Sequence, residues 1–155
     1  MSVTSLRRAL LGACLIVCVL SPGGVAQASA RTDRLEAGIV RAMNDYRAQH
    51  GLPKLRQQRG FARAADAHSA AMLRQNTLKH GDYGKRVRRY VRRVSRVGEN
   101  LAWMQGCSPS EIVQMWARSS GHRRVMLSRS FRRVGVAQRS RSNACFVTAD
   151  FGTAR

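Results

Sequence analysis

The chain is organised around one stretch, Val97-Gly98-Glu99-Asn100-Leu101-Ala102-Trp103. Its large apolar residues alternate with small or polar ones, which predicts a strand with Glu99 on the apolar side. A carboxylate under apolar cover needs hydrogen bonds or a cationic partner. We expect His80, upstream, and His122, downstream, to reach it, although Glu99 could instead cap a loop or pair with an arginine.

The amino terminus has the layout of a secretory signal peptide. Two arginines precede an apolar run over residues 9–20, and small residues follow a Pro-Gly break, so we expect cleavage near Ala28 or Ala30. The run is shorter than the ~20 residues of a spanning helix, although an uncleaved anchor is the alternative. The sequence therefore predicts a protein that is secreted, either extracellular or in the cell envelope.

Cysteine usage supports export. Removal of residues 1–30 takes away Cys14 and Cys18, and leaves Cys107 and Cys145 in the domain of residues 31–155. Two remaining cysteines in an exported protein predict one disulfide. Attachment of lipid at Cys14 is the alternative use of the amino-terminal segment.

The formal net charge of +20 comes almost entirely from arginine. Such a field attracts nucleic acid, anionic lipid or anionic cell-wall polymer without specificity.

Residues 85–96 keep one apolar stripe at helical spacing, which predicts a short helix with a basic outer face. That face could dock on an anionic envelope polymer or be merely solvated. It lacks interleaved aromatics, so we expect no specific nucleic-acid recognition. The basic patch consists of Arg86, Arg88, Arg89, Arg92 and Arg93.

Helices precede strands along the chain, which indicates an α+β domain with a small antiparallel sheet. His68 falls on the apolar side of a helix, where a structural histidine is the more common case. His122 follows a glycine at the end of the third helix, which we expect to close over residues 119–123. The expected helices span residues 33–50, 59–76 and 110–119, and the later strands span 133–138 and 145–152 around a turn at 139–143.

These residues resemble the CAP superfamily, also called the SCP domain, of cysteine-rich secretory, antigen 5 and pathogenesis-related proteins. The resemblance covers nearly all of residues 33–152 and looks like the bacterial branch. Its landmarks are Asn44 and Arg47 before Gly-Leu-Pro at 51–53, His80, Gly-Glu-Asn-Leu-Ala at 98–102, Trp116 through Ser-Ser-Gly-His-Arg at 119–123, Arg-Val-Gly-Val at 133–136 and Asp-Phe-Gly at 150–152.

The resemblance implies a three-layer α-β-α sandwich with a cleft lined by two histidines and two acids. The histidines match His80 and His122, and the first acid matches Glu99. The second acid does not carry over, because Ala117, Arg118 and Ser119 occupy the region after the third helix's tryptophan, where the family has it.

Two imidazoles and a carboxylate are a reasonable ligand set for zinc or another divalent cation, so His80, Glu99 and His122 are the candidate metal ligands. No nucleophile is evident. We therefore expect a monomeric, non-catalytic extracellular binding module. The alternatives are a metal-dependent hydrolase that uses the His80, Glu99 and His122 cleft, and an electrostatic binder of anionic cell-wall polymer or nucleic acid through residues 85–96.

Overall fold

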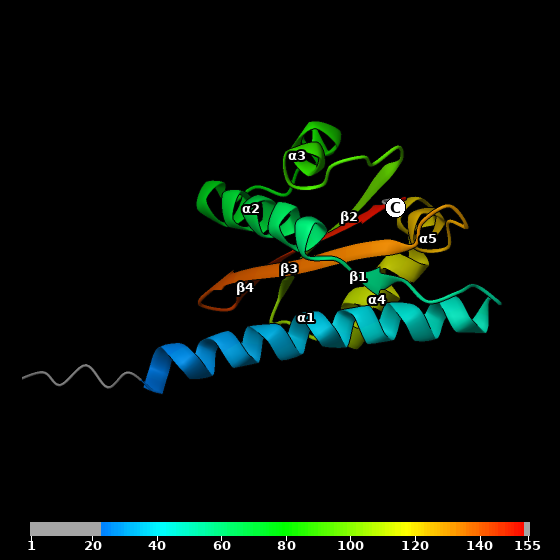
Figure 1. Ribbon diagram of the computed structural model, residues 1–155. Coiled ribbons are helices and arrows are strands. Elements are labelled where there is room, and N and C mark those ends of the chain that lie inside the picture. The colour runs from blue at the N-terminus through cyan, green and yellow to red at the C-terminus, as the bar shows by residue number, and fades with distance from the viewer. Residues whose placement is uncertain (1–22, 154–155) are drawn as a thin grey trace, which may run out of the picture.

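The strand that carries Glu99 lies at one edge of a four-stranded sheet, and helices cover both faces of the sheet (Figure 1). The computed structural model describes residues 23–153, so the predicted apolar signal run and Cys14 lie outside the described residues. The elements in chain order are α1 (Gly23–Gln49), β1 (Arg56–Gln57), α2 (Arg59–Gln75), α3 (Tyr83–Tyr90), β2 (Val97–Gln105), α4 (Pro109–Arg118), α5 (Ser120–Met126), β3 (Arg133–Arg141) and β4 (Ala144–Gly152).

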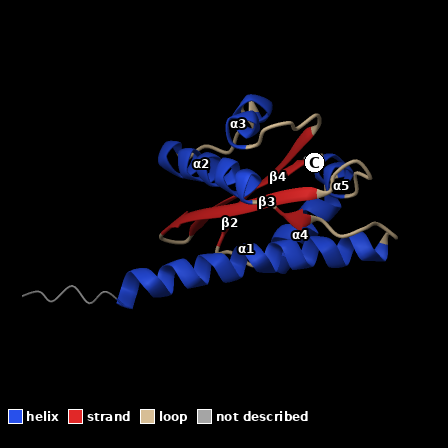
Figure 2. Ribbon diagram, viewed as in Figure 1, coloured by secondary structure: helices blue, strands red, loops and turns tan. Residues whose placement is uncertain are grey.

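The sheet has the strand order β1-β3-β4-β2. Its three long strands are antiparallel neighbours, as predicted, but the short β1 pairs with β3 in parallel, so the sheet is mixed. β1 has only two residues, too few to show an alternating pattern in the sequence. α2 and α3 lie on one face, and α1 and α4 lie on the other (Figure 2). This arrangement is the predicted three-layer sandwich.

Apolar side chains fill the space on each side of the sheet. Ile39 and Met43, one turn apart on α1, are buried with Trp116 of α4 against the sheet. The indole Nε1 of Trp116 donates a hydrogen bond of 2.7 Å to the carbonyl of Leu101 in β2. On the opposite face α2 packs directly on β3 at Gly135, where an added Cβ would lie 1.9 Å from a backbone nitrogen of α2.

Arg47 of α1 is completely buried and holds the loops at the end of α5. Its Nη1 donates to the carbonyl of Ser128 at 3.1 Å and to that of Met126, while its Nε donates to the carbonyl of Pro53 at 3.0 Å. These hydrogen bonds satisfy a buried guanidinium with backbone acceptors. They also fix the carboxyl end of α5 against α1.

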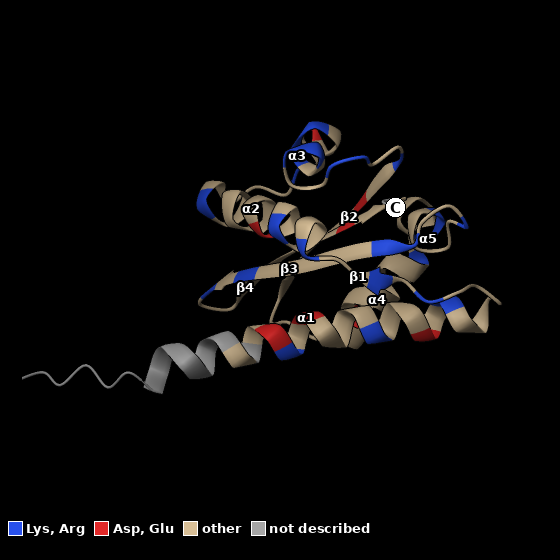
Figure 3. Ribbon diagram, viewed as in Figure 1, with Lys and Arg blue, Asp and Glu red and all other residues tan. Residues whose placement is uncertain are grey.

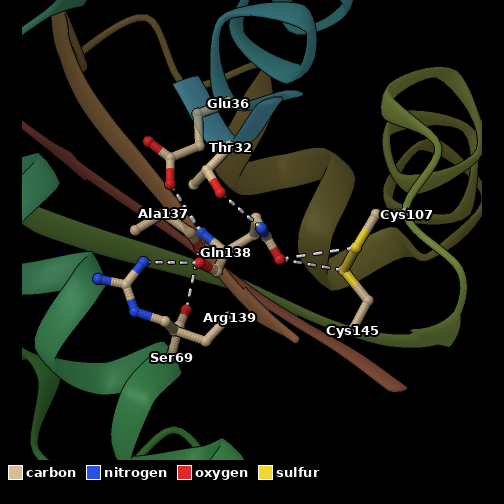
Figure 4. Close-up of a disulfide and its surroundings, with 8 residues drawn as sticks. All are labelled: Thr32, Glu36, Ser69, Cys107, Ala137, Gln138, Arg139 and Cys145. Atoms are coloured by element: carbon tan, nitrogen blue, oxygen red, sulfur yellow. Dashed lines mark hydrogen bonds between the residues drawn. A yellow bond between two sulfur atoms is a disulfide. The ribbon is translucent and has the colours of Figure 1, made fainter. Parts of the chain in front are cut away.

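The predicted disulfide between Cys107 and Cys145 is confirmed, and it ties the segment before α4 to β4 (Figure 4). The amide oxygen of Gln138 lies 3.7 and 3.8 Å from its two sulfurs. The backbone N–H of Gln138 donates to Glu36 of α1 at 3.0 Å. The helix expected to begin at residue 33 begins at Gly23 instead, so Glu36 lies inside α1, where its carboxylate accepts this hydrogen bond from β3.

Two local predictions are wrong. The helix expected over residues 85–96 ends at Tyr90, and Arg93 adopts a left-handed conformation with φ 58° that no helix continues through. Its valines are nevertheless buried, because the irregular segment keeps Val91 and Val94 against α2, whereas Tyr90 is exposed. The second error concerns residues 119–123, which do not close α4: Ser119 is extended, and a separate helix, α5, begins at Ser120.

No helix within residues 23–153 combines the length and the apolar character needed to cross a membrane.

Candidate functional site

An open cleft of about 530 Å³ lies over the first residues of β2. β2 is an edge strand, and segments from both faces of the sheet contribute residues to this cleft. The loop before α3 approaches the side of Glu99, and α5 approaches the side of Asn100, the next residue along the strand. The cleft is lined by His80, Tyr83, Val97, Gly98, Glu99, Asn100, Ser119, Gly121, His122, Val125 and Phe131.

His80 and Glu99 form a hydrogen-bonded pair at this cleft, as the sequence predicted. The imidazole Nδ1 lies 2.8 Å from Glu99 Oε1, and since a carboxylate accepts, Nδ1 carries the hydrogen. The Glu99 side chain has no exposed surface, whereas that of His80 is 53% exposed. Burial raises the pKa of Glu99, and Arg86 and His80 oppose this increase.

Arg86 is the partner that the sequence interpretation misplaced. We expected it on the outer basic face of its helix, but its side chain turns inward and is only 12% exposed. Its Nη2 contacts Glu99 Oε2 and lies 2.9 Å from Asp150 Oδ1. The guanidinium therefore joins a carboxylate of β2 to a carboxylate of β4.

Asp150 is a second acid that the sequence interpretation missed. It lies directly opposite Glu99 in the antiparallel pairing of β4 with β2, and its side chain is fully buried. Burial raises its pKa to about 7 despite the attraction of Arg86. Glu99 was identified because it is an acid on the apolar side of a strand. The same signal was present at Asp150, which alternates along β4 on the same side as Phe146 and Thr148.

His68 of α2 completes the buried polar cluster. Its Nε2 donates to the carbonyl of Lys79 at 2.8 Å and lies 3.7 Å from Glu99 Oε2. Burial, followed by the charge of Arg86, lowers the pKa of His68 to about 4, so the ring is neutral at pH 7. The imidazole thus fixes the loop that carries His80, in keeping with the structural role we expected for it.

His122 lines the same cleft but binds neither His80 nor Glu99 through any hydrogen bond or ion pair within residues 23–153. It is held through its backbone, because Asn100 Nδ2 donates to the His122 carbonyl at 3.0 Å. Burial lowers the pKa of His122, so its imidazole is neutral at pH 7. Within the residues that the structure describes, His122 Nδ1 and Asn100 Oδ1 are both buried without a hydrogen-bond partner. Two residues that line the α5 side of the cleft therefore each carry an unsatisfied polar atom.

The predicted metal ligands do not fit a divalent cation in this arrangement. Both oxygens of Glu99 are engaged, one by His80 and the other by Arg86, whose positive charge opposes a cation beside it. Across the described residues, no three His, Cys, Asp or Glu side chains are grouped so that they could hold a metal ion.

An α-β-α sandwich with a glutamate and two histidines at an edge-strand cleft agrees with the class of domain that the resemblance implied. Residues 40–151 match the cysteine-rich secretory protein family, CAP, and the chain therefore belongs to this family.

Three relatives illustrate how far the likeness extends. Human Golgi-associated plant pathogenesis-related protein 1 is 26% identical over 129 residues, which cover 73% of this chain and 79% of that protein. The membrane protein YlbC of Bacillus subtilis is 30% identical over 106 residues, covering 65% of this chain and 30% of YlbC. An extracellular SCP-domain protein from Bacillus anthracis superposes with a TM-score of 0.70 and is 28% identical, covering 86% of this chain and 44% of that one. The chain thus spans less than half of either Bacillus protein.

Proposed function

We propose that this chain is a secreted, non-catalytic binding domain whose cleft captures an uncharged polar segment of an envelope polymer. The observation that carries the proposal is the contrast between the two sides of the cleft. On one side Glu99 is neutralised by internal partners. On the other side, His122 Nδ1 and Asn100 Oδ1 are buried and have no hydrogen-bond partner among residues 23–153.

The side with Glu99 is poorly suited to catalysis. A general base must be free to accept a proton, and Arg86 and His80 occupy both oxygens of this carboxylate. Cys107 and Cys145 are joined in a disulfide and supply no thiolate. The hydrolase alternative also required a metal ion, which the charge of Arg86 disfavours at this position.

The side with His122 is suited to binding. A buried polar atom without a partner costs about 1–3 kcal/mol, which a ligand recovers when it supplies a hydrogen bond. Asn100 Oδ1 can only accept, and a neutral imidazole Nδ1 can accept or donate. Val125 and Phe131 add an apolar wall beside these atoms. A ligand that carries amide or hydroxyl groups next to a small apolar group would match these hydrogen-bonding atoms and the apolar wall.

The test is an NMR titration of the purified chain with triacetylchitotriose and, separately, with an uncharged acetylated trialanine amide. We expect signals of Asn100 and His122 to shift with at least one probe. His122→Ala should abolish the shift of the Asn100 signal, while His50→Ala, a change at an exposed histidine in the turn just after α1, should preserve it. If neither probe shifts these signals in the folded wild-type protein, the proposed ligand class is wrong.

Export is tested separately by expressing residues 1–155 in a bacterial host and determining the amino terminus of protein recovered outside the cytoplasm. The proposal predicts a new amino terminus just after Ala28 or Ala30. Protein that keeps residues 1–30, or that stays in the cytoplasm, would contradict secretion.

One observation favours a second candidate function, binding of an anionic polymer. Lys and Arg gather over α3 and the loop that follows it (Figure 3). Arg88, Arg89, Arg92 and Arg93 are exposed there, and none forms an ion pair within the described residues. Unpaired surface charges remain available to a polyanion.

A polyphosphate titration at increasing salt tests this candidate. Replacing Arg88, Arg89, Arg92 and Arg93 together by Gln should weaken binding at least about ten-fold and reduce its salt dependence. A control changes the net charge equally at four other exposed positions, Arg118, Arg124, Arg129 and Arg141. Equal loss in both variants would mean that net charge, rather than the face of α3, binds the polymer.

A further inference from the structure

We propose that the guanidinium of Arg86 takes the place of a metal ion in this cleft: it holds Glu99 and Asp150 together and, through Glu99, fixes the orientation of His80. The inference concerns the metal that the family resemblance implied, and it does not depend on the ligand proposed above.

The need for a cation follows from the strand pairing. Glu99 and Asp150 lie directly opposite one another on neighbouring antiparallel strands, and neither side chain has exposed surface. Like charges at such a position repel one another, and burial removes the water that would screen them. Two facing buried carboxylates are therefore stable only with a proton or a cation between them.

Arg86 is the group that supplies this cation. Of the basic groups facing the two carboxylates, His68 comes from α2 and is neutral, while His80 comes from a loop and bonds Glu99 alone. A guanidinium is a cation, and Arg86, from α3, contacts both acids.

A single nitrogen atom of Arg86 bridges the carboxylates of Glu99 and Asp150. The same nitrogen, Nη2, contacts Oε2 of Glu99 and Oδ1 of Asp150. A metal ion held by Glu99 would need one of the two carboxylate oxygens that His80 and Arg86 already engage. The nitrogen is supplied by the chain itself, from a side chain that is 12% exposed, so a metal ion would have to displace a buried ion pair.

The bridge also determines how His80 is presented to the cleft. Because Arg86 engages Oε2 of Glu99, the other oxygen faces His80 Nδ1 and accepts its hydrogen. When the ring is neutral with its hydrogen on Nδ1, the second ring nitrogen, Nε2, can accept a hydrogen bond from a ligand. Arg86 is therefore a positioning residue for His80.

The experiment uses the purified chain with its disulfide intact and compares Arg86→Met with Arg88→Met, a matched change at an exposed residue of the same helix. Zinc affinity is measured by calorimetry, and the tautomer of His80 is read from its imidazole ¹⁵N shifts. Wild type and the Arg88 variant should bind zinc weakly and keep hydrogen on Nδ1. The Arg86 variant should bind zinc at least about ten-fold more tightly and show a mixture of tautomers.

Arg86→Lys keeps the charge and remains informative if the methionine variant does not fold. It should keep zinc affinity within about three-fold of wild type. Tight stoichiometric zinc binding by the wild type that shifts the His80 signals would overturn the inference. So would a folded Arg86→Met variant whose zinc affinity and His80 tautomer match those of wild type.

Discussion

Asp150→Asn tests the balance of forces in the buried cluster through the pH dependence of stability. Burial raises the pKa of Asp150 from 3.8 to about 7, while Arg86 acts in the opposite direction. Between these two pH values the folded protein holds a proton that the unfolded chain releases. The stabilising effect of this proton is complete below pH 3.8 and is lost as the pH rises through 7. Asparagine cannot ionise, so the Asp150→Asn variant does not lose this stability as the pH rises.

The magnitude follows from the size of the pKa change. A difference of about three pH units corresponds to about 4 kcal/mol of unfolding free energy, because one unit is worth about 1.4 kcal/mol. The side chain of Asp150 is fully buried, so solvent does not screen this effect. We therefore expect the stability of the variant, relative to wild type, to rise by about 4 kcal/mol between pH 4 and pH 8.

Urea denaturation of both proteins at intervals across this range measures the difference, with the disulfide intact throughout. The raised pKa of Glu99 and the lowered pKa of His68 give wild type additional pH dependence, of opposite signs, and the comparison largely cancels both. Asp45→Asn on the exposed side of α1 controls for the change in net charge. A difference that falls with pH would refute the reasoning, because it would mean that the attraction of Arg86 outweighs burial.

Two further predictions concern the scaffold. Gly135→Ala should destabilise the protein by about 3 kcal/mol or more in urea denaturation, because the new Cβ would lie 1.9 Å from a backbone nitrogen of α2. Gly121→Ala should be neutral or slightly stabilising, because its new Cβ would come within 4 Å of no described residue beyond its chain neighbours and its own helix backbone. Replacing Cys107 and Cys145 together by Ser should cost about 4 kcal/mol, since the bridge closes a loop between residues 38 apart, and a loss below about 1 kcal/mol would contradict this estimate.

The sequence predicted the parts of the fold that repeat a simple pattern. The alternation around Glu99 identified β2, and the helical spacing of apolar residues identified α2 and α4 to within a residue or two. The pattern could not distinguish the helical part of residues 85–96 from the irregular part, because both bury valines against α2. It also missed β1, whose pairing depends on a strand far away in the chain.

The site was predicted only where a local signal existed. His80 and Glu99 do meet, and His122 lines the same cleft. The inward direction of Arg86 was not predictable, since α3 also carries Arg88 and Arg89 and only the packing of the helix distinguishes Arg86 from them. Asp150 reaches Glu99 through strand register, which no spacing in the sequence specifies.

The hydrogen bonds of Arg47 also bear on how the rim of the cleft can evolve. This side chain recognises main-chain carbonyls at Met126 and Ser128 rather than particular side chains. Nearly every amino acid offers the same carbonyl, so residues 127–130 can exchange side chains without losing these hydrogen bonds. Phe131, which lines the cleft and is itself buried in the core, follows this segment. Relatives could therefore diverge in ligand preference along this segment while α5 keeps its place.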